Sequence, residues 1–271
     1  MGTPSSTGRN GPLALVFNAL VISFMLAPLL IVCAVAFTPD NALSLPRHGL
    51  SLRWFAAVFA HPDFVQSFWN SLWLALGSAT LATAFAVPAG LALTRHHFRG
   101  RAALNALFLS PLLIPHLVLG VALLRLSSLI GSSGSFGFLL LCHTLVVTPY
   151  TLRLVLASLV GFDRSTEQAA QSLGASPLTS FWRITLPLIL PGLSGGWLLA
   201  FINSFDEVTL SIFVTSPATV TLPVRMYMYA TESIDPMMAA VSALMVGLTA
   251  LAMLVLDRLY GLDKVLVGGP K

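Results

Sequence analysis

Six long apolar segments, separated by polar stretches, form the hydrophobic pattern of this chain of 271 residues. Each is long enough for a helix to cross a hydrocarbon core of about 30 Å, which takes roughly 20 residues. None alternates apolar and polar positions with a period of two, as the strands of a membrane barrel do. The pattern predicts an all-α membrane protein with six transmembrane helices, at about 13–37, 70–94, 103–126, 136–158, 188–213 and 237–257.

The third segment is the least regular of the six, because Pro111, Pro115 and His116 lie inside it. Proline removes a backbone donor, but neighbouring helices or water can satisfy the freed carbonyl groups inside a membrane. We therefore expect a kink in one helix at this point rather than a break into two.

Composition agrees with a membrane location, since 56% of the residues are hydrophobic and only 9% are charged. A soluble chain of this composition would expose large apolar patches. The apolar segments follow one another so closely that we expect a single transmembrane domain over residues 1–271. Cys33 and Cys142 lie inside apolar segments and are expected to be packing residues, and no His, Asp and Glu cluster has the spacing of a metal site.

Basic residues indicate which side of the membrane each loop faces, because cytoplasmic loops carry an excess of Lys and Arg. We expect cytoplasmic N- and C-termini and a long cytoplasmic loop at 159–187. Basic residues beside anionic lipid then account for the net charge of +4 without nucleic acid. Ten of the 14 basic residues fall inside (Arg9, Arg95, Arg99, Arg101, Arg153, Arg164, Arg183, Arg258, Lys264 and Lys271) and four outside (Arg47, Arg53, Arg125 and Arg225).

The long inner loop has the sequence features of two short helices joined by a tight turn. Good helix formers run from Thr166 to Leu173 and end at Gly174, a residue suited to the left-handed position that follows a helix. Ser176 offers an N-cap oxygen and Pro177 suits the first helical position. A second short helix is therefore predicted from Pro177 to about Arg183, with Leu186-Pro187 marking the start of the fifth span.

This loop resembles that of permease subunits in binding-protein-dependent ATP-binding-cassette importers. Their motif reads Glu-Ala-Ala, three residues, Gly, nine residues, Ile, one residue, Leu-Pro. The first position departs from the motif, because Gln168 replaces the glutamate and Glu167 stands one residue earlier. Six residues fall in register with the motif: Ala169, Ala170, Gly174, Ile184, Leu186 and Pro187.

The resemblance implies the fold of a type I importer permease in the bacterial inner membrane, with a coupling helix that docks on a cytoplasmic ATPase. The implied partners are a second permease, favoured as a different chain, two ATPase subunits and an external solute-binding protein. The chain has no Gly-x-x-x-x-Gly-Lys-Ser/Thr loop, and its only lysines are Lys264 and Lys271. We therefore expect no catalytic residue or cofactor here, and ATP with Mg on the partner ATPase.

The outer half of the fifth segment carries two adjacent carboxylates, Asp206 and Glu207. Asn203, Glu207 and Ser211 repeat at intervals of four and Asp206 follows Asn203 by three, which predicts a polar, acidic helix face. Carboxylates at membrane depth are costly without water or a partner and indicate function. One interpretation pairs them with Arg125 or Arg225, and the other makes them a binding site or gate for a cation.

The segments Ser204–Val208 and Thr221–Tyr227, with Pro236, resemble permeases of the spermidine/putrescine importer group. Members import polyamines, and related proteins take opines, γ-aminobutyrate or other small amines, so the resemblance implies a small cationic solute. A polyamine site should combine carboxylates with aromatic faces. Tyr227 and Tyr229 are the candidate aromatic residues, and an interfacial aromatic belt is their alternative role.

Two other classes of protein share single features with this chain. Gly131-Ser-Ser-Gly134 at the start of the fourth segment is similar to the serine motif of rhomboid-type intramembrane proteases, but no histidine follows His143, and only His116 or His143 remains as a base. A flexible outer turn is the simpler interpretation. A secondary transporter would not need the 159–187 loop, and no repeat relates the two halves of the chain.

Overall fold

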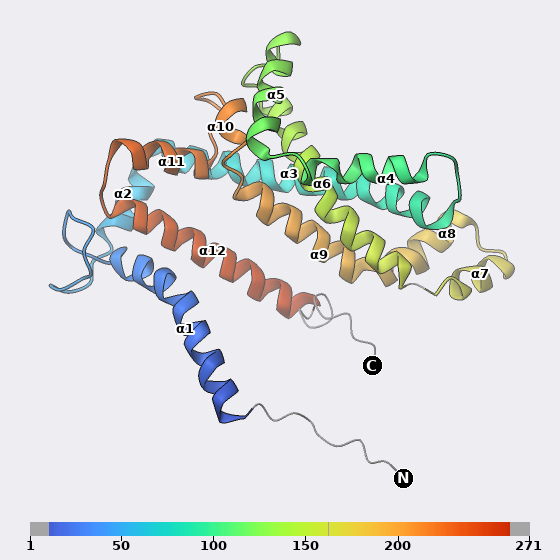
Figure 1. Cartoon of the computed structure of the whole chain (residues 1–271), viewed down its shortest axis with the longest axis horizontal. Coiled ribbons are helices and arrows are strands. Elements are labelled where there is room, and N and C mark those ends of the chain that lie inside the picture. The colour runs from blue at the N-terminus through green and yellow to red at the C-terminus, as the bar shows by residue number, and fades with distance from the viewer. Residues whose placement is uncertain (1–10, 162, 261–271) are drawn as a thin grey trace. The chain divides into compact units, whose positions relative to one another are not determined.

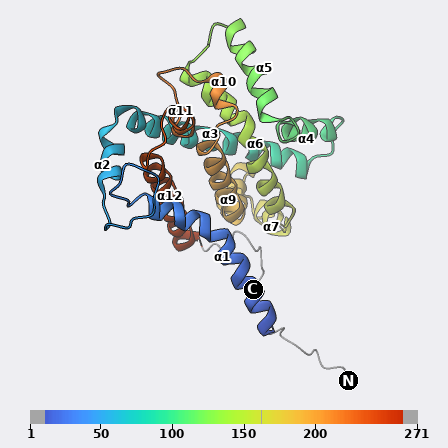
Figure 2. The same ribbon diagram turned by 60° about the vertical axis from the view of Figure 1, so that its left-hand side comes forward.

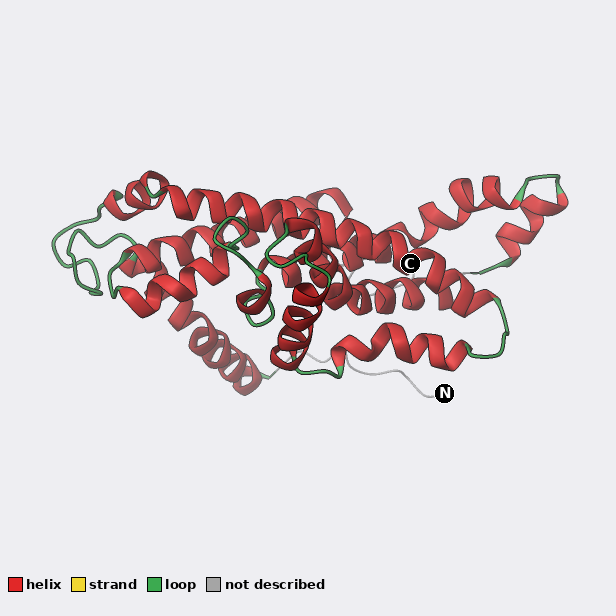
Figure 3. Cartoon of the chain, turned by 90° about the horizontal axis from the view of Figure 1, so that it is seen from above, coloured by secondary structure: helices red, strands yellow, loops and turns green. Residues whose placement is uncertain are grey.

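The computed structural model describes residues 11–161 and 163–260, and every regular element in that part of the chain is helical (Figures 1 and 3). Arg9, Lys264 and Lys271, three of the residues that indicate orientation, lie outside the described ranges. The elements are α1 (Pro12–Val35), α2 (Arg53–Ala60), α3 (Pro62–Arg95), α4 (Arg101–Leu109), η1 (Ser110–Leu112), α5 (His116–Leu129), α6 (Phe136–Val160), α7 (Ser165–Ser172), α8 (Pro177–Ser180), η2 (Phe181–Thr185), α9 (Leu186–Phe205), α10 (Ser211–Val214), α11 (Leu222–Glu232) and α12 (Met237–Tyr260).

Two compact units divide the chain, and each is described by itself. The first comprises residues 1–61 and 229–248, and the second residues 62–228 and 249–271. In the first unit, α1 is an apolar helix none of whose residues is buried. The second unit holds both regions for which the sequence predicts function.

All six predicted apolar segments are helical, although their lengths differ. Four helices have the length and composition to cross a membrane: α1, α3, α6 and the continuous run Pro177–Phe205. The bent pair of α4/η1 with α5 adds a fifth if it is one span, and α12 contributes a shorter apolar stretch, Met237–Leu251. An all-helical membrane protein is confirmed, and six crossings stay a prediction.

The third segment is broken rather than kinked, which corrects the expectation for Pro111 and Pro115. Arg101–Leu112 and His116–Leu129 meet at 100°, and Figures 1 and 2 show α5 turning away from α4. Pro115 restricts the residue before it to extended conformations, so the helix ends there. Packing favours the new direction, because α5 lies against α10 and Gly120 leaves no room for a Cβ beside Phe213.

Helices α3, α6 and α9 pack against one another and form the core of the second unit. Small residues allow the close approach: a Cβ on Gly196 would meet Thr151, and one on Gly90 would meet Val155. Gly196 thus faces α6 of the same chain.

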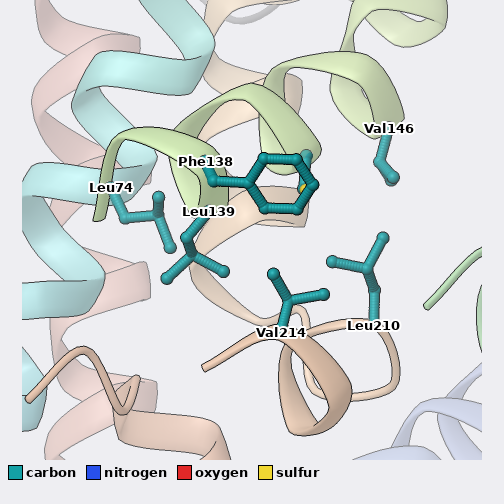
Figure 4. Close-up of a cluster of buried hydrophobic side chains, with 7 residues drawn as sticks. Leu74, Phe138, Leu139, Val146, Leu210 and Val214 are labelled. Carbon is teal, nitrogen blue, oxygen red and sulfur yellow. The ribbon is translucent and has the colours of Figure 1, made fainter. Parts of the chain in front are cut away.

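A second cluster fixes the segment that follows α9. Leu210 and Val214 pack on Leu74 from α3 and on side chains of α6, as Figure 4 shows. The α6 side chains are Phe138, Leu139, Cys142 and Val146, so Cys142 is a packing residue as predicted. The chain after α9 is thus held against the bundle.

Helix α9 ends at Phe205, which corrects the prediction of one polar helix face from Asn203 to Ser211. Residues 206–210 form a turn, and a new short helix, α10, begins at Ser211. Asp206 and Glu207 therefore lie beyond the end of α9. The Glu207 carboxylate accepts a hydrogen bond from the amide of Leu210 (2.8 Å), the cap residue of α10, and so satisfies a donor at the start of that helix.

Candidate coupling and translocation sites

The inner loop folds into the predicted turn between two short helices. Gly174 adopts a left-handed backbone (φ 94°), and the amides of Gly174 and Ala175 donate to the carbonyls of Gln171 and Ala170, both at 3.0 Å. This pair of hydrogen bonds satisfies the last carbonyls of α7 and reverses the chain. The predicted role of Gly174 as the helix stop is confirmed.

The second short helix begins as predicted but does not end as predicted. The Ser176 hydroxyl accepts from the Thr179 amide (3.1 Å), and Pro177 is the first helical residue. The helix then continues through the π-helical turn η2 into α9, so Pro177–Phe205 is one run. Leu186-Pro187 stands at the start of α9 as predicted, but no loop separates it from the preceding helical turns. The second half of the loop is therefore a helical extension of α9.

Glu167, the loop residue that stands before the motif, lies inside the fold. Its side chain is buried, and its two oxygens accept from the two terminal nitrogens of Arg95 at 2.8 and 2.7 Å. Arg95, the last residue of α3, also donates to the Thr185 hydroxyl (3.3 Å). Such bidentate pairs are strong and directional. The pair connects α7 to the C-terminal end of α3.

Gln168, at the usual glutamate position, is exposed. Glu167 is engaged by Arg95, whereas Gln168 presents its side chain at the surface. Of the other motif residues, Ala169, Gly174 and Pro187 are exposed, and Ala170, Ile184 and Leu186 are half-buried.

Three apolar side chains project from this loop, and the motif did not reveal them. Leu173 is 91% exposed, Leu178 67% and Trp182 59%. We call these three residues the loop tip. A cluster of exposed apolar side chains indicates a protein or membrane contact. Their apolar character within a polar loop was the available sequence signal.

The two carboxylates of the turn at 206–210 differ in their surroundings. Glu207 is buried, and its Oε2 lies 2.8 Å from Nδ1 of His116, the first residue of α5. Asp206 is exposed and has no side-chain hydrogen bond or ion pair within the described residues. The predicted pairing with Arg125 or Arg225 is wrong: Arg225 pairs with Asp63, and Arg125 is exposed on α5. Nothing in the sequence indicated that His116 is the partner of Glu207, because the two residues are 91 positions apart.

His143 joins the two ends of this turn. Buried in α6 at 1% exposure, it has Nδ1 at 2.9 Å from the Ser204 hydroxyl and Nε2 at 2.9 Å from the Ser211 hydroxyl. Ser204 also accepts from Ser78 of α3 (2.8 Å). The imidazole of His143 on α6 therefore joins Ser204 at the end of α9 to Ser211 at the start of α10. Through Ser204 it is also connected to α3. No sequence spacing indicated these contacts.

The remaining candidates of the translocation path lie apart from that turn along the chain. Asn203 donates to the Leu199 carbonyl one helical turn back (2.8 Å). Tyr227 is exposed and lines a cavity of about 490 Å³ together with Asn70, Asp63 and Arg225. Tyr229 donates to Asp235 (2.6 Å), and burial together with that hydrogen bond raises its pKa to about 12.

The serine motif has no catalytic arrangement in the described structure. The nearest polar partner of the Ser133 hydroxyl is Ser127 Oγ at 3.4 Å, while His116 and His143 are engaged elsewhere. Gly131 and Gly134 both have positive φ, as a turn requires. Among residues 11–161 and 163–260, no group of three or more His, Cys, Asp and Glu is arranged to hold a metal.

The second unit is an apolar helical bundle. It carries a loop with exposed apolar side chains at one end and a turn with two carboxylates at the other. These features are typical of a polytopic transport subunit. The chain belongs to the family of binding-protein-dependent transport system inner membrane components, whose family model matches residues 82–262. It is thus a multi-pass inner-membrane permease of a binding-protein-dependent importer and not an enzyme. This family binds no cofactor, and ATP is hydrolysed on a partner subunit.

Two characterised relatives share most of the chain. The spermidine/putrescine transport system permease protein PotC of Haemophilus influenzae is 33% identical over 90% of this chain and 94% of its own. The putrescine transport system permease protein PotI of Escherichia coli K12 is 31% identical over 87% and 86%. Among solved structures, a bacterial importer of the acidic polysaccharide alginate matches 94% of this chain and 98% of its own with a TM-score of 0.69 at 16% identity. That likeness concerns the fold.

Proposed function

We propose that this chain forms half of the translocation path for a small cationic solute, a polyamine such as putrescine or spermidine. The relatives named for spermidine and putrescine transport support this substrate class. An opine, γ-aminobutyrate or another amino-acid-like solute is the alternative within the same importer type.

One observation supports a coupling role for the loop: its tip is apolar and exposed, while its base is held to the helical bundle by a buried ion pair, here called the internal tie. The loop tip residues Leu173, Leu178 and Trp182 offer a contact surface. Glu167 and Arg95 connect the same loop to α3, and the continuous helix from Pro177 connects it to α9. A push on the tip is therefore transmitted to two helices of the bundle. We assign Glu167 to this internal tie and Gln168 to the polar docking contact with the ATPase.

The assembly contains a second permease, favoured as a different chain, together with two ATPase subunits and a solute-binding protein outside the membrane. The N- and C-termini and the 159–187 loop face the cytoplasm, and the chain crosses the membrane six times. The turn at 206–210 then faces the side from which an imported solute arrives. Asp206 is its exposed carboxylate, and an exposed carboxylate can attract an ammonium group.

The coupling role is tested with the complex reconstituted in proteoliposomes, in which ATP hydrolysis and uptake are measured together. Leu173→Asp places a charge on the loop tip and should abolish binding-protein-stimulated hydrolysis and uptake. Thr166→Asp adds the same charge at an exposed position in the first turn of α7, where an acidic residue is favourable, and should leave both intact. Normal uptake by Leu173→Asp would disprove docking through the tip.

The substrate class is tested in the same preparation. ATPase stimulation is compared across putrescine, spermidine, γ-aminobutyrate, an opine and an anionic sugar, each with the cognate binding protein. Stimulation by polyamines supports the proposal, and stimulation by an amino-acid-like solute supports the alternative. Stimulation only by the anion would overturn the cationic class and leave the coupling role standing.

A further inference from the structure

A second charged site adjoins the Arg95–Glu167 pair at the start of the 159–187 loop. It is a cavity of about 230 Å³ lined by the end of α3, the start of α4, the end of α6 and the residue before α7. Three of its lining residues are arginines: Arg95, Arg101 and Arg164. The others are Thr94, Leu159 and Val160.

The charge of this cavity is not balanced by the described part of the protein. Glu167 neutralises Arg95, but Arg101 and Arg164 form no ion pair with a described carboxylate. Arg101 only contacts the His97 ring (3.3 Å). Asp163, beside Arg164, accepts instead from the amide and hydroxyl of Ser165 (2.9 and 2.8 Å). No carboxylate is among the described lining residues, so Arg101 and Arg164 can each bind an anion in the cavity.

Helix ends add to this preference for an anion. Arg101 is the first residue of α4, and Arg164 is the cap residue before α7. The first amides of a helix lack internal acceptors and favour negative charge. Guanidinium groups match phosphate oxygens in bidentate geometry. Since Asp163 already accepts from the first amide of α7, the two arginines and the start of α4 are the groups suited to a phosphate.

The position and the apolar wall indicate where that phosphate comes from. Leu159 and Val160 close the last turn of α6, a membrane-spanning helix, and the Val160 side chain is 78% exposed. A soluble ion needs no apolar wall beside its arginines, whereas a lipid brings an acyl chain next to its headgroup. The arginines would repel the small cationic solute proposed above, so the cavity suits an anionic headgroup rather than a solute in transit.

We propose that this cavity binds the phosphate of an anionic phospholipid such as phosphatidylglycerol, held by Arg101 and Arg164 beside the Arg95–Glu167 pair. The leaflet in which the lipid lies rests on the proposed function, through the cytoplasmic placement of the 159–187 loop. A bound headgroup would bridge α4 and α7 and would make the stiffness of the loop depend on anionic lipid. Basic pockets between membrane helices are a general form of such recognition.

Native mass spectrometry of the purified complex tests the site, with phosphatidylglycerol and phosphatidylcholine of equal chain length added in detergent. Arg101→Gln with Arg164→Gln should lower phosphatidylglycerol retention about 10- to 30-fold, with phosphatidylcholine unchanged. The matched control Arg99→Gln with Arg183→Gln removes two exposed arginines from the same inner segments but outside the cavity, and should stay within about twofold. Equal losses in both pairs, or no loss in either, would overturn the site.

Further arms separate the competing occupants. If excess inorganic phosphate displaces the lipid and stabilises the complex alone, the source is a soluble phosphate and the lipid assignment is wrong. If the Gln pair releases the ATPase while keeping the lipid, acidic side chains of the ATPase fill the cavity, and the proposal is also wrong. Should the Gln pair not fold, Arg101→Lys with Arg164→Lys keeps the charge but loses the bidentate geometry, and a several-fold loss is expected. None of these readouts depends on uptake, so they fail or succeed independently of the proposed function.

Discussion

The two ends of the α3, α6 and α9 bundle each bury a glutamate against a basic side chain from another helix, but the two pairs differ in kind. At the end that carries the 159–187 loop, here called the inner end, Glu167 forms a bidentate pair with Arg95, which is always charged. At the end that carries the 206–210 turn, here called the outer end, Glu207 contacts one nitrogen of His116, and an imidazole carries charge only when protonated. Beside Glu207, Asp206 is left exposed.

The difference matches what each end is proposed to do. A permanent bidentate pair suits a loop that must transmit force without yielding. A pair of lower strength, beside a second carboxylate without a described partner, suits a turn that changes its contacts when a cation arrives. Replacing the same type of residue at the two ends should therefore have different consequences.

The largest effect is expected from breaking the inner pair. Arg95→Ala leaves the buried Glu167 carboxylate unpaired, which costs roughly 3–5 kcal/mol. Thermal unfolding of the purified complex would register this loss, together with loss of ATPase stimulation. The double variant Arg95→Met with Glu167→Leu should recover most of the stability, because apolar replacements of a buried pair are often neutral. If Arg95→Ala unfolds at the same temperature as the wild type, the pair does not stabilise the fold.

Next in size is the removal of the outer linkage at His143. His143→Leu leaves the hydroxyls of Ser204 and Ser211 without their partner, at roughly 1–3 kcal/mol for each polar group left unsatisfied. We expect lower melting temperature and slower uptake, with ATPase subunits still bound. Ser128→Ala is a control for loss of a hydroxyl, since Ser128 only bonds within its own helix. Loss of ATPase binding in His143→Leu would contradict the separation of the two ends.

Gly174→Val should give a smaller loss of stability with a large loss of coupling. The left-handed backbone costs a non-glycine residue about 1–2 kcal/mol, and no atom lies within 4 Å of the added Cβ, so strain alone acts. Hydrolysis should continue without uptake. Gly174→Asn tolerates the left-handed region and should retain coupling. Uptake at the wild-type rate in the valine variant would remove the turn from the coupling path.

The smallest effect on stability is expected at Asp206. Because it is exposed and has no described partner, Asp206→Asn should change the unfolding free energy by no more than about 0.5 kcal/mol. Uptake of a dicationic amine should nevertheless fall. Glu207→Gln should show the opposite balance, because its carboxylate holds His116 and the Leu210 amide. If the combined variant imports the amine at the wild-type rate, the turn is no cation gate.

Local features of the fold were predictable because neighbouring residues decide them. Gly174 stops α7, Ser176 caps α8 and Pro177 begins it, each through contacts within a few residues. Apolar segments of about 20 residues likewise mark helices without knowledge of their neighbours. These predictions held.

The errors arose where a distant residue decided the local structure. Pro115 ends the first part of the third segment, but the direction of α5 depends on its packing against α10, and the chain after α9 is held by the contacts of Ser204 and Ser211 with His143. Partners separated by 61 to 91 residues in sequence leave no periodic signal. The loop tip was missed because a motif records spacing and not exposure.

The sequence by itself determined that this chain is a helical membrane permease subunit whose loop at 159–187 has the importer motif, since hydropathy and local turn chemistry are properties of short stretches. Only the tertiary structure decided which carboxylates are engaged: Glu167 by Arg95, Glu207 by His116, with Asp206 left exposed. Charges find partners through space. The packing of α3, α5, α6 and α9 therefore selects the residues that hold the fold and those available for function.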